Sequence, residues 1–257
     1  MQLFDAHNHV QDERIFPDIE KIMHRAREAG VVAMGVKGCC EADWHRVVDI
    51  AERYEGVHPA FGLHPWFIAG RSDAWLGKLE RMLVEHPQAS VGEIGIDHAI
   101  GDCDQADQEA VFLAQMELAR KLDRPVSIHC RQAWGRLIKL LDGFGDLTRG
   151  MLIHCFGGSA EVATELVKRG GYISFSGSIT RPNNKKAGPA IRAVPGDRIL
   201  IETDAPDITP HGAPSERNEP AFVRLVLAKA AELKGCSEGE LAALTFQNAL
   251  RFFAGMD

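Results

Sequence analysis

The chain has 257 residues, of which 45% are hydrophobic and 25% charged, and its formal net charge is −7. This is ordinary globular composition, and no apolar run approaches the roughly 20 residues that a membrane-spanning helix needs. The negative charge disfavours non-specific binding to nucleic acid, but it does not exclude a nucleic-acid substrate, because local charge and metal ions govern a catalytic cleft.

The sequence also predicts a cytoplasmic protein. Its first residues, 1–5, lack the basic region followed by an apolar stretch that marks a secretory signal. The cysteines at positions 39, 40, 103, 130, 155 and 236 form no CxxC pair. Scattered thiols in a chain of this size indicate a reducing compartment rather than a disulfide framework. These features leave the oligomeric state open, and a monomer is compatible with them.

Apolar, strand-like runs alternate with amphipathic, helix-like stretches along the whole chain. The expected strands are 2–7, 31–37, 57–63, 90–95, 125–130, 150–154, 171–176 and 198–202. The expected helices are 17–29, 42–54, 73–86, 104–122, 133–143, 159–169, 185–193, 219–232 and 238–253. The run 31–36 is nearly all apolar, as is typical of a strand buried on both faces of a parallel sheet. No linker rich in Gly, Ser or Pro interrupts this order, so residues 1–257 are predicted to form a single domain.

Eight strand–helix units in about 250 residues indicate an α/β protein, a single (β/α)₈ TIM barrel. The alternative is an open, doubly wound sheet, which normally carries a glycine-rich phosphate loop after its first strand. Here the first strand ends in His7-Asn8-His9 instead, with no glycine. The barrel is therefore the preferred prediction.

The same His7-Asn8-His9 stretch is the first candidate metal site. Side chains at positions i and i+2 of a strand point to the same side, so both imidazoles can face one ion. In a barrel, active-site groups come from the carboxyl ends of the strands. The residues that fall at these ends and can ligate a metal are His7, His9, Glu93, His129, His154 and Asp204. Six potential metal ligands on one rim of the barrel predict a metal centre.

This set of donors predicts two ions rather than one, since it exceeds the four ligands usual for zinc. Ions about 3.5–4 Å apart are common in hydrolytic sites, and Glu93 can bridge them with its two oxygens. A hydroxide between the ions is the predicted nucleophile. Asp204 is predicted to accept a proton from it and pass that proton to the leaving group, so Asp204 and Glu93 are the candidate catalytic residues.

At this point the motifs, in their order and spacing, resemble those of the TatD family of metal-dependent hydrolases. They are Asp5-Ala-His7-Asn-His9, Gly62-Leu-His64-Pro65, Gly92-Glu93-Ile-Gly-Ile-Asp97, Ile128-His129-Cys-Arg131, His154-Cys-Phe-Gly-Gly-Ser159, Glu202-Thr-Asp204-Ala-Pro206 and Arg217-Asn218-Glu219-Pro220. The resemblance runs over essentially the whole chain.

This resemblance implies a barrel of the amidohydrolase superfamily with two divalent ions, with zinc, magnesium and manganese as the candidates. By the family pattern, one ion is held by His7, His9, Glu93 and Asp204, and the other by Glu93, His129 and His154. The activity that it implies is hydrolysis of DNA phosphodiester bonds, often from a 3′ end. It also places His64 and Arg131 near the substrate phosphate.

The residues themselves support part of this substrate assignment. Arg131 follows His129 by two positions, and a guanidinium beside a metal pair suits a phosphate; the alternative is an ion pair with a rim carboxylate. His64 with Pro65 is either a substrate-binding residue or only a turn. His211, in the long loop after Asp204, is a further candidate for contact with substrate. Trp66 and Trp134, just past the third and fifth strands, are candidates for base stacking or for packing.

Some residues depart from the family pattern, and they weaken the assignment to DNA. Val10-Gln11 stands where the family usually has Leu-Asp, and Trp66 stands where a polar residue is often found. A hydrolase acting on a small ester, lactone, amide or phosphoester on the same scaffold is therefore one alternative. A non-catalytic metal-binding protein is another.

Overall fold

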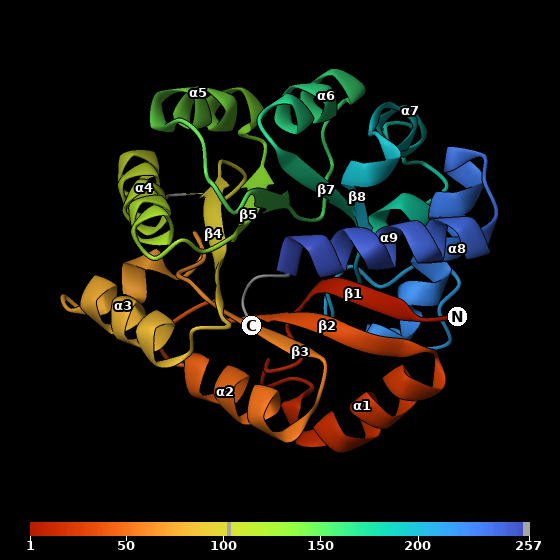
Figure 1. Ribbon diagram of the computed structural model, residues 1–257, viewed down its shortest axis with the longest axis horizontal. Coiled ribbons are helices and arrows are strands. Elements are labelled where there is room, and N and C mark those ends of the chain that lie inside the picture. The colour runs from red at the N-terminus through yellow and green to blue at the C-terminus, as the bar shows by residue number, and fades with distance from the viewer. Residues whose placement is uncertain (102–103, 254–257) are drawn as a thin grey trace.

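Eight parallel strands follow one another in chain order around a barrel in the computed structural model, which describes residues 1–101 and 104–253 (Figure 1). They are β1 Leu3–Asn8, β2 Val31–Lys37, β3 Val57–Phe61, β4 Ser90–Asp97, β5 Val126–Arg131, β6 Met151–Ile153, β7 Gly171–Phe175 and β8 Ile199–Ile201. Where the first and last strands meet, the amide of Asp204 donates to the carbonyl of His7 at 3.0 Å, and that of His9 to Ala205 at 2.7 Å. The structure confirms the predicted barrel.

Helices separate successive strands and form the outer ring of the barrel (Figure 1). They are α1 Ile19–Glu28, α2 Trp44–Arg53, α3 Trp75–Glu85, α4 Gln105–Lys121, α5 Trp134–Phe144, α6 Ala160–Lys168, α7 Ala187–Ala193 and α8 Val223–Lys234, with α9 Glu238–Phe253 at the end. α1 and α8 begin later than predicted because short 3₁₀ turns that contain Pro17 and Pro220 precede them. Cys103 lies outside the described residues.

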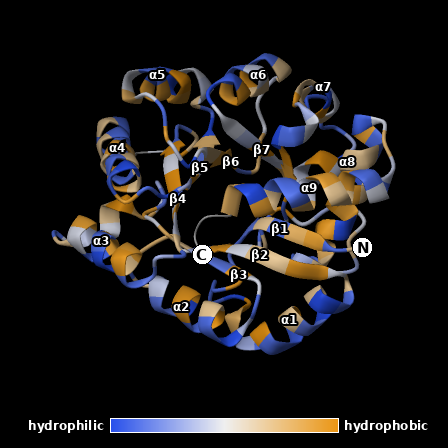
Figure 2. Cartoon of the chain, viewed as in Figure 1, coloured by the Kyte–Doolittle hydropathy of each residue, from blue (hydrophilic) through white to orange (hydrophobic). Residues whose placement is uncertain are grey.

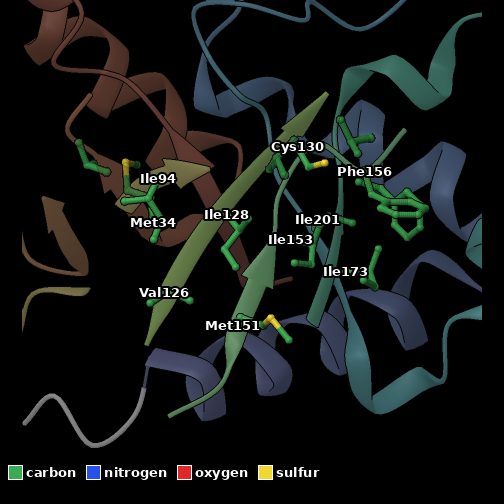
Figure 3. Close-up of a cluster of buried hydrophobic side chains, with 14 of the residues drawn as sticks. Met34, Ile94, Val126, Ile128, Cys130, Met151, Ile153, Phe156, Ile173 and Ile201 are labelled. Atoms are coloured by element: carbon green, nitrogen blue, oxygen red, sulfur yellow. The ribbon is translucent and has the colours of Figure 1, made fainter. Parts of the chain in front are cut away.

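Alternation of side chains along the strands divides the core into two parts. Outward-facing residues such as Ile128, Ile153 and Ile201 pack under the helices (Figure 3). Their neighbours Leu152 and Leu200 point into the barrel, because successive strand residues face opposite sides. Hydrophobic residues accordingly gather on the strands and on the inner faces of the helices (Figure 2).

Helix α9 covers one end of the barrel and leaves the other end to the loops. Its residues Phe252 and Phe253 pack with Phe4 and Leu200 in the barrel interior, and the Phe4 and Phe253 rings stack 4.9 Å apart. In Figure 1, α9 crosses over the strands. The carboxyl ends of the strands remain available for polar side chains. Within the described ranges, no helix has the length and hydropathy needed to cross a membrane.

Loop contacts shape the rim at the carboxyl end of β3, which is shorter than predicted. Instead of extending the strand, the backbone N–H of Leu63 donates to the Gln115 side chain at 2.7 Å, and that side chain donates to the Leu63 carbonyl at 3.1 Å. Gln115 comes from α4, so this helix fixes the segment that carries His64.

Candidate metal centre

The structure brings the six predicted metal ligands together at the carboxyl end of the barrel. His7, Glu93 and His129 lie within β1, β4 and β5, whereas His9, His154 and Asp204 follow directly after β1, β6 and β8. All are largely withdrawn from solvent; the most exposed side chain, that of His129, is 14% accessible. Strands far apart in the sequence thus converge on one polar cluster.

Glu93 lies at the centre of the cluster, and its Oε2 atom faces the first group of ligands. Nε2 of His7 lies 3.1 Å from this oxygen, and Nε2 of His9 lies 3.0 Å from it. Oδ1 of Asp204 lies 3.5 Å from His9 Nε2 and 3.9 Å from His7 Nε2. His7, His9 and Asp204 form a group whose donor atoms are close enough to hold one metal ion.

The other carboxylate oxygen of Glu93, Oε1, faces a second group. It lies 3.1 Å from Nδ1 of His129, 2.7 Å from Nε2 of His154 and 3.1 Å from Nε2 of His64. His64, Glu93 and His129 form a second group able to hold a metal ion. His64 was predicted from the sequence as a substrate-binding residue; the structure places it among the candidate ligands.

Each imidazole of the predicted ligand set has a partner or a neighbouring acceptor on its outer nitrogen. His9 Nδ1 donates to the carbonyl of Lys37 at 2.7 Å, and His129 Nε2 donates to Oδ2 of Asp97 at 3.0 Å. Because these oxygens only accept, each outer nitrogen carries a hydrogen, and the inward nitrogen of the neutral ring is the one left with a lone pair for a metal ion. On the outer side of His7, Nδ1 lies 3.0 Å from the Ser127 hydroxyl, and on that of His154, Nδ1 lies 3.5 Å from Oε1 of Glu202.

Burial would lower the pKa of His154, but the neighbouring Glu93 outweighs it and raises that pKa well above its ordinary value, so an inward nitrogen can also carry a proton and bring positive charge to the carboxylates. Burial alone would raise the pKa of Glu93, but the surrounding imidazoles, led by His154 and His64, hold it well below its usual range. Burial of Asp204 is likewise outweighed by the hydrogen bond from His9 and by the neighbouring imidazoles, which lower its pKa. Both carboxylates are therefore ionised at neutral pH. Nitrogen and oxygen donors oriented by outer partners are the chemistry of a divalent metal site.

The predicted substrate-binding residues surround this cluster with different exposures. The Arg131 side chain is exposed at the end of β5 and, two residues after His129, extends to the same side of the strand. Among the described residues it forms no ion pair with a rim carboxylate, the alternative that the sequence left open. His211 is exposed in the loop after β8, where its amide donates to the Thr180 hydroxyl at 2.7 Å. Contact of either residue with substrate stays a prediction.

The two candidate stacking residues differ clearly. Trp134 is partly buried against the core, and its ring packs 4.9 Å from that of Phe156. Trp66 is 54% exposed beside the cluster.

Val10 and Gln11, which depart from the family pattern, are both buried. The Gln11 amide donates to the Lys37 carbonyl at 2.6 Å and to Asp43 at 3.2 Å, so it holds the end of β2 in place.

Sequence reasoning missed several polar residues that surround the ligands. Glu202 and Cys39 each complete a further, overlapping group able to hold a metal, with His7 and His154 in one and with His9 and Glu93 in the other. Glu202 could have been found, because it precedes Asp204 by two positions and so shares its side of the chain. Lys37 is fully buried, and its only sequence signal is a charge at the end of an apolar run.

Comparison with known proteins identifies relatives along the whole chain. A family model described as TatD related DNase matches residues 4–254. The metal-dependent hydrolase YabD of Bacillus subtilis is 35% identical, and the match covers 98% of this chain and 98% of the relative. The 3′-5′ ssDNA/RNA exonuclease TatD of Cronobacter sakazakii is 33% identical, with 98% and 97% covered. The crystal structure of YJJV, a TatD homolog from Escherichia coli, superposes with a TM-score of 0.92 at 32% identity, covering 97% of each chain.

Proposed function

The chain belongs to the TatD family of metal-dependent hydrolases, and we propose that it is a dinuclear-metal phosphodiesterase that removes nucleotides from the 3′ end of single-stranded DNA or RNA. The family membership supports the reaction class, and the printed activity of the exonuclease relatives supports the substrate. The arrangement of donors around Glu93 supports the use of two ions.

The observation that carries the proposal is the division of the ligands between the two oxygens of Glu93. We assign one ion to the Oε2 side, with His7, His9 and Asp204, and the other to the Oε1 side, with His129 and His154. His64 adds a further nitrogen on the second side. The preponderance of imidazole favours zinc or manganese over magnesium, which prefers oxygen ligands.

Divalent ions bound at these residues would lower the pKa of water towards neutrality and neutralise the charge of a phosphodiester. The chain supplies the proton transfer and the positioning. Asp204 is ionised and, at 13% side-chain exposure, is more accessible than Glu93 at 2%. It can therefore accept the proton of the attacking water and return it to the leaving oxygen. Arg131, exposed on the same side as His129, can bind a phosphate oxygen with its fork of N–H donors.

Digestion of 3′ ends tests this proposal. Single-stranded DNA labelled at its 5′ end is incubated with the manganese-loaded protein, with and without a chelator, using wild type and Asp204→Asn. We expect stepwise shortening by wild type only, abolished by chelation, and metal analysis should give about two ions per chain. Asp207→Asn is the matched control, because this exposed carboxylate of the same loop pairs with Arg14 instead of the cluster.

Two results would overturn the proposal. Absence of metal-dependent shortening, together with turnover of a small ester or phosphoester, would establish the alternative hydrolase. Equal activity of Asp204→Asn and wild type would remove the assigned proton acceptor. Loss of activity in Asp207→Asn as well would show that any change in this loop disrupts the site.

A further inference from the structure

Trp66 presents a large exposed aromatic surface directly beside the candidate metal centre. Its ring centre lies 5.2 Å from that of His64 and 6.4 Å from that of His129, in edge-to-face geometry. The side chain is 54% exposed, although indole rings are usually well covered in folded proteins. An exposed aromatic ring next to a catalytic cluster calls for a functional explanation.

The ring is held in place from its polar edge. Nε1 of Trp66 donates to Oδ2 of Asp97 at 2.7 Å. The same oxygen of Asp97 lies 3.0 Å from Nε2 of His129, so one buried carboxylate holds both rings. The indole is thus anchored by a short hydrogen bond to a buried carboxylate. An anchored ring loses little conformational entropy when a ligand stacks on it.

The other tryptophans, all of which lie in the described part of the chain, are buried or packed against the hydrophobic core. Trp44 is buried, with its Nε1 donating to the carbonyl of Gly62 at 3.0 Å. Trp75 and Trp134 are partly buried and pack against hydrophobic clusters. Trp66 alone combines exposure, a polar anchor and proximity to the candidate ligands.

A basic side chain lies on β5, the strand next to the one that carries Asp97. Arg131 of β5 pairs in register with Asp97 of β4, the residue that anchors Trp66. A guanidinium suits a phosphate and an indole suits a nucleobase, so the two together match one nucleotide.

We propose that Trp66 is a stacking platform for the base of a nucleotide that flanks the scissile phosphate. This inference rests on the proposed function and adds a binding subsite to it. Stacking on an indole face is tolerant of base identity, so the subsite contributes affinity for single-stranded nucleic acid without sequence preference. Arg131 would hold the adjoining phosphate while the base rests on Trp66.

Oligonucleotides with a single missing base test this subsite. Wild type, Trp66→Leu and Trp66→Phe are compared on natural single-stranded DNA and on the same DNA made abasic at the 3′-terminal or at the penultimate position. In wild type, one of the abasic substrates should show a roughly 10- to 100-fold lower kcat/KM. Trp66→Leu should lose a similar factor on natural DNA and respond little to removal of the base. Trp66→Phe keeps an aromatic face without the bond to Asp97, and should retain most of the discrimination.

Trp134→Leu is the matched control, because it removes the other rim tryptophan, and it should discriminate against the abasic substrate as wild type does. Discrimination by Trp66→Leu that equals wild type would overturn the inference while leaving the nuclease intact. If wild type instead hydrolyses bis(4-nitrophenyl) phosphate but no DNA, the proposed function itself fails.

Discussion

Replacing Asp97 with asparagine tests how the second group of candidate ligands is oriented. Oδ2 of Asp97 is 3.0 Å from His129 Nε2, and the carboxylate is buried. This contact keeps the imidazole hydrogen on Nε2 and leaves the Nδ1 lone pair directed at Glu93 Oε1, 3.1 Å away. Asparagine has nearly the same shape but no charge, so it weakens that preference without opening a cavity.

The expected loss is a 10- to 100-fold weaker affinity for one ion, since supporting carboxylates of this kind contribute about that much. It corresponds to roughly 1.4–2.7 kcal/mol of binding free energy. The other ion should be little affected, because His7 and His9 are oriented by Ser127 and by the Lys37 carbonyl instead. Calorimetric titration of metal-free protein with Mn²⁺ or Zn²⁺ should therefore resolve one weakened site and one nearly unchanged site.

Asp107→Asn is the matched control for this measurement. Asp107 forms a bidentate pair with Arg71, with oxygen–nitrogen distances of 2.7 and 2.8 Å, and is separate from the imidazole cluster. It should titrate as wild type does. If Asp97→Asn binds both ions with wild-type affinity, the carboxylate does not orient a ligand and the reasoning is refuted.

Three other changes probe the cluster and its surroundings. Glu93→Gln removes the charge that both groups share, so metal content should fall and DNA hydrolysis should drop by more than about 1000-fold; a variant that retains two ions would contradict the bridging role. A chelator should lower the melting temperature by roughly 11–22 °C, because two ions, each at a free concentration of about 100 times its Kd, together contribute about 5.4 kcal/mol; calorimetry with and without EDTA measures this, and equal melting temperatures would count against it. Lys37→Met should raise the free energy of unfolding by about 1–3 kcal/mol, because Nζ is fully buried with no hydrogen-bond partner among the described residues. Burial lowers the pKa of Lys37 to about 7, so this gain should be full below pH 7 and shrink as the pH approaches 10.5; denaturant unfolding at several pH values checks it, and a loss of stability would contradict it.

The fold and the convergence of the candidate ligands could be predicted because both depend on periodic features of the sequence. Apolar runs that alternate with amphipathic stretches specify strands and helices. A parallel barrel then places every strand end on one rim, so His7, Glu93 and Asp204 could be associated without knowledge of their distances. The ends of strands are harder to predict where a side chain takes the place of a neighbouring strand as hydrogen-bond partner, as Gln115 does for Leu63 after the end of β3.

Features that depend on side-chain direction beyond the strands could not be predicted. Both Trp66 and Trp134 follow a strand end, yet one turns to solvent and the other packs on Phe156. His64 could equally have ended a turn, whereas the path of its loop brings Nε2 to Glu93. Short-range sequence patterns carry no information about such choices, which are decided by long-range contacts such as the bond from Trp66 to Asp97.

The candidate ligands also impose a cost on the fold that metal would offset. Folding brings Glu93 and Asp204 into a buried cluster to which Glu202, 3.5 Å from His154, also belongs, and burial raises the pKa of Glu202. Without an ion, the inward lone pairs of His9 and His129 face carboxylate oxygens, and each such contact is repulsive unless a proton intervenes. An ion that binds only the folded chain replaces that repulsion with attraction, so metal affinity and folding stability are linked. Substitutions that weaken a ligand while removing its charge should therefore destabilise the metal-loaded protein and spare or even stabilise the metal-free one. Comparing the melting temperatures of Glu93→Gln and wild type in both states would separate these two contributions.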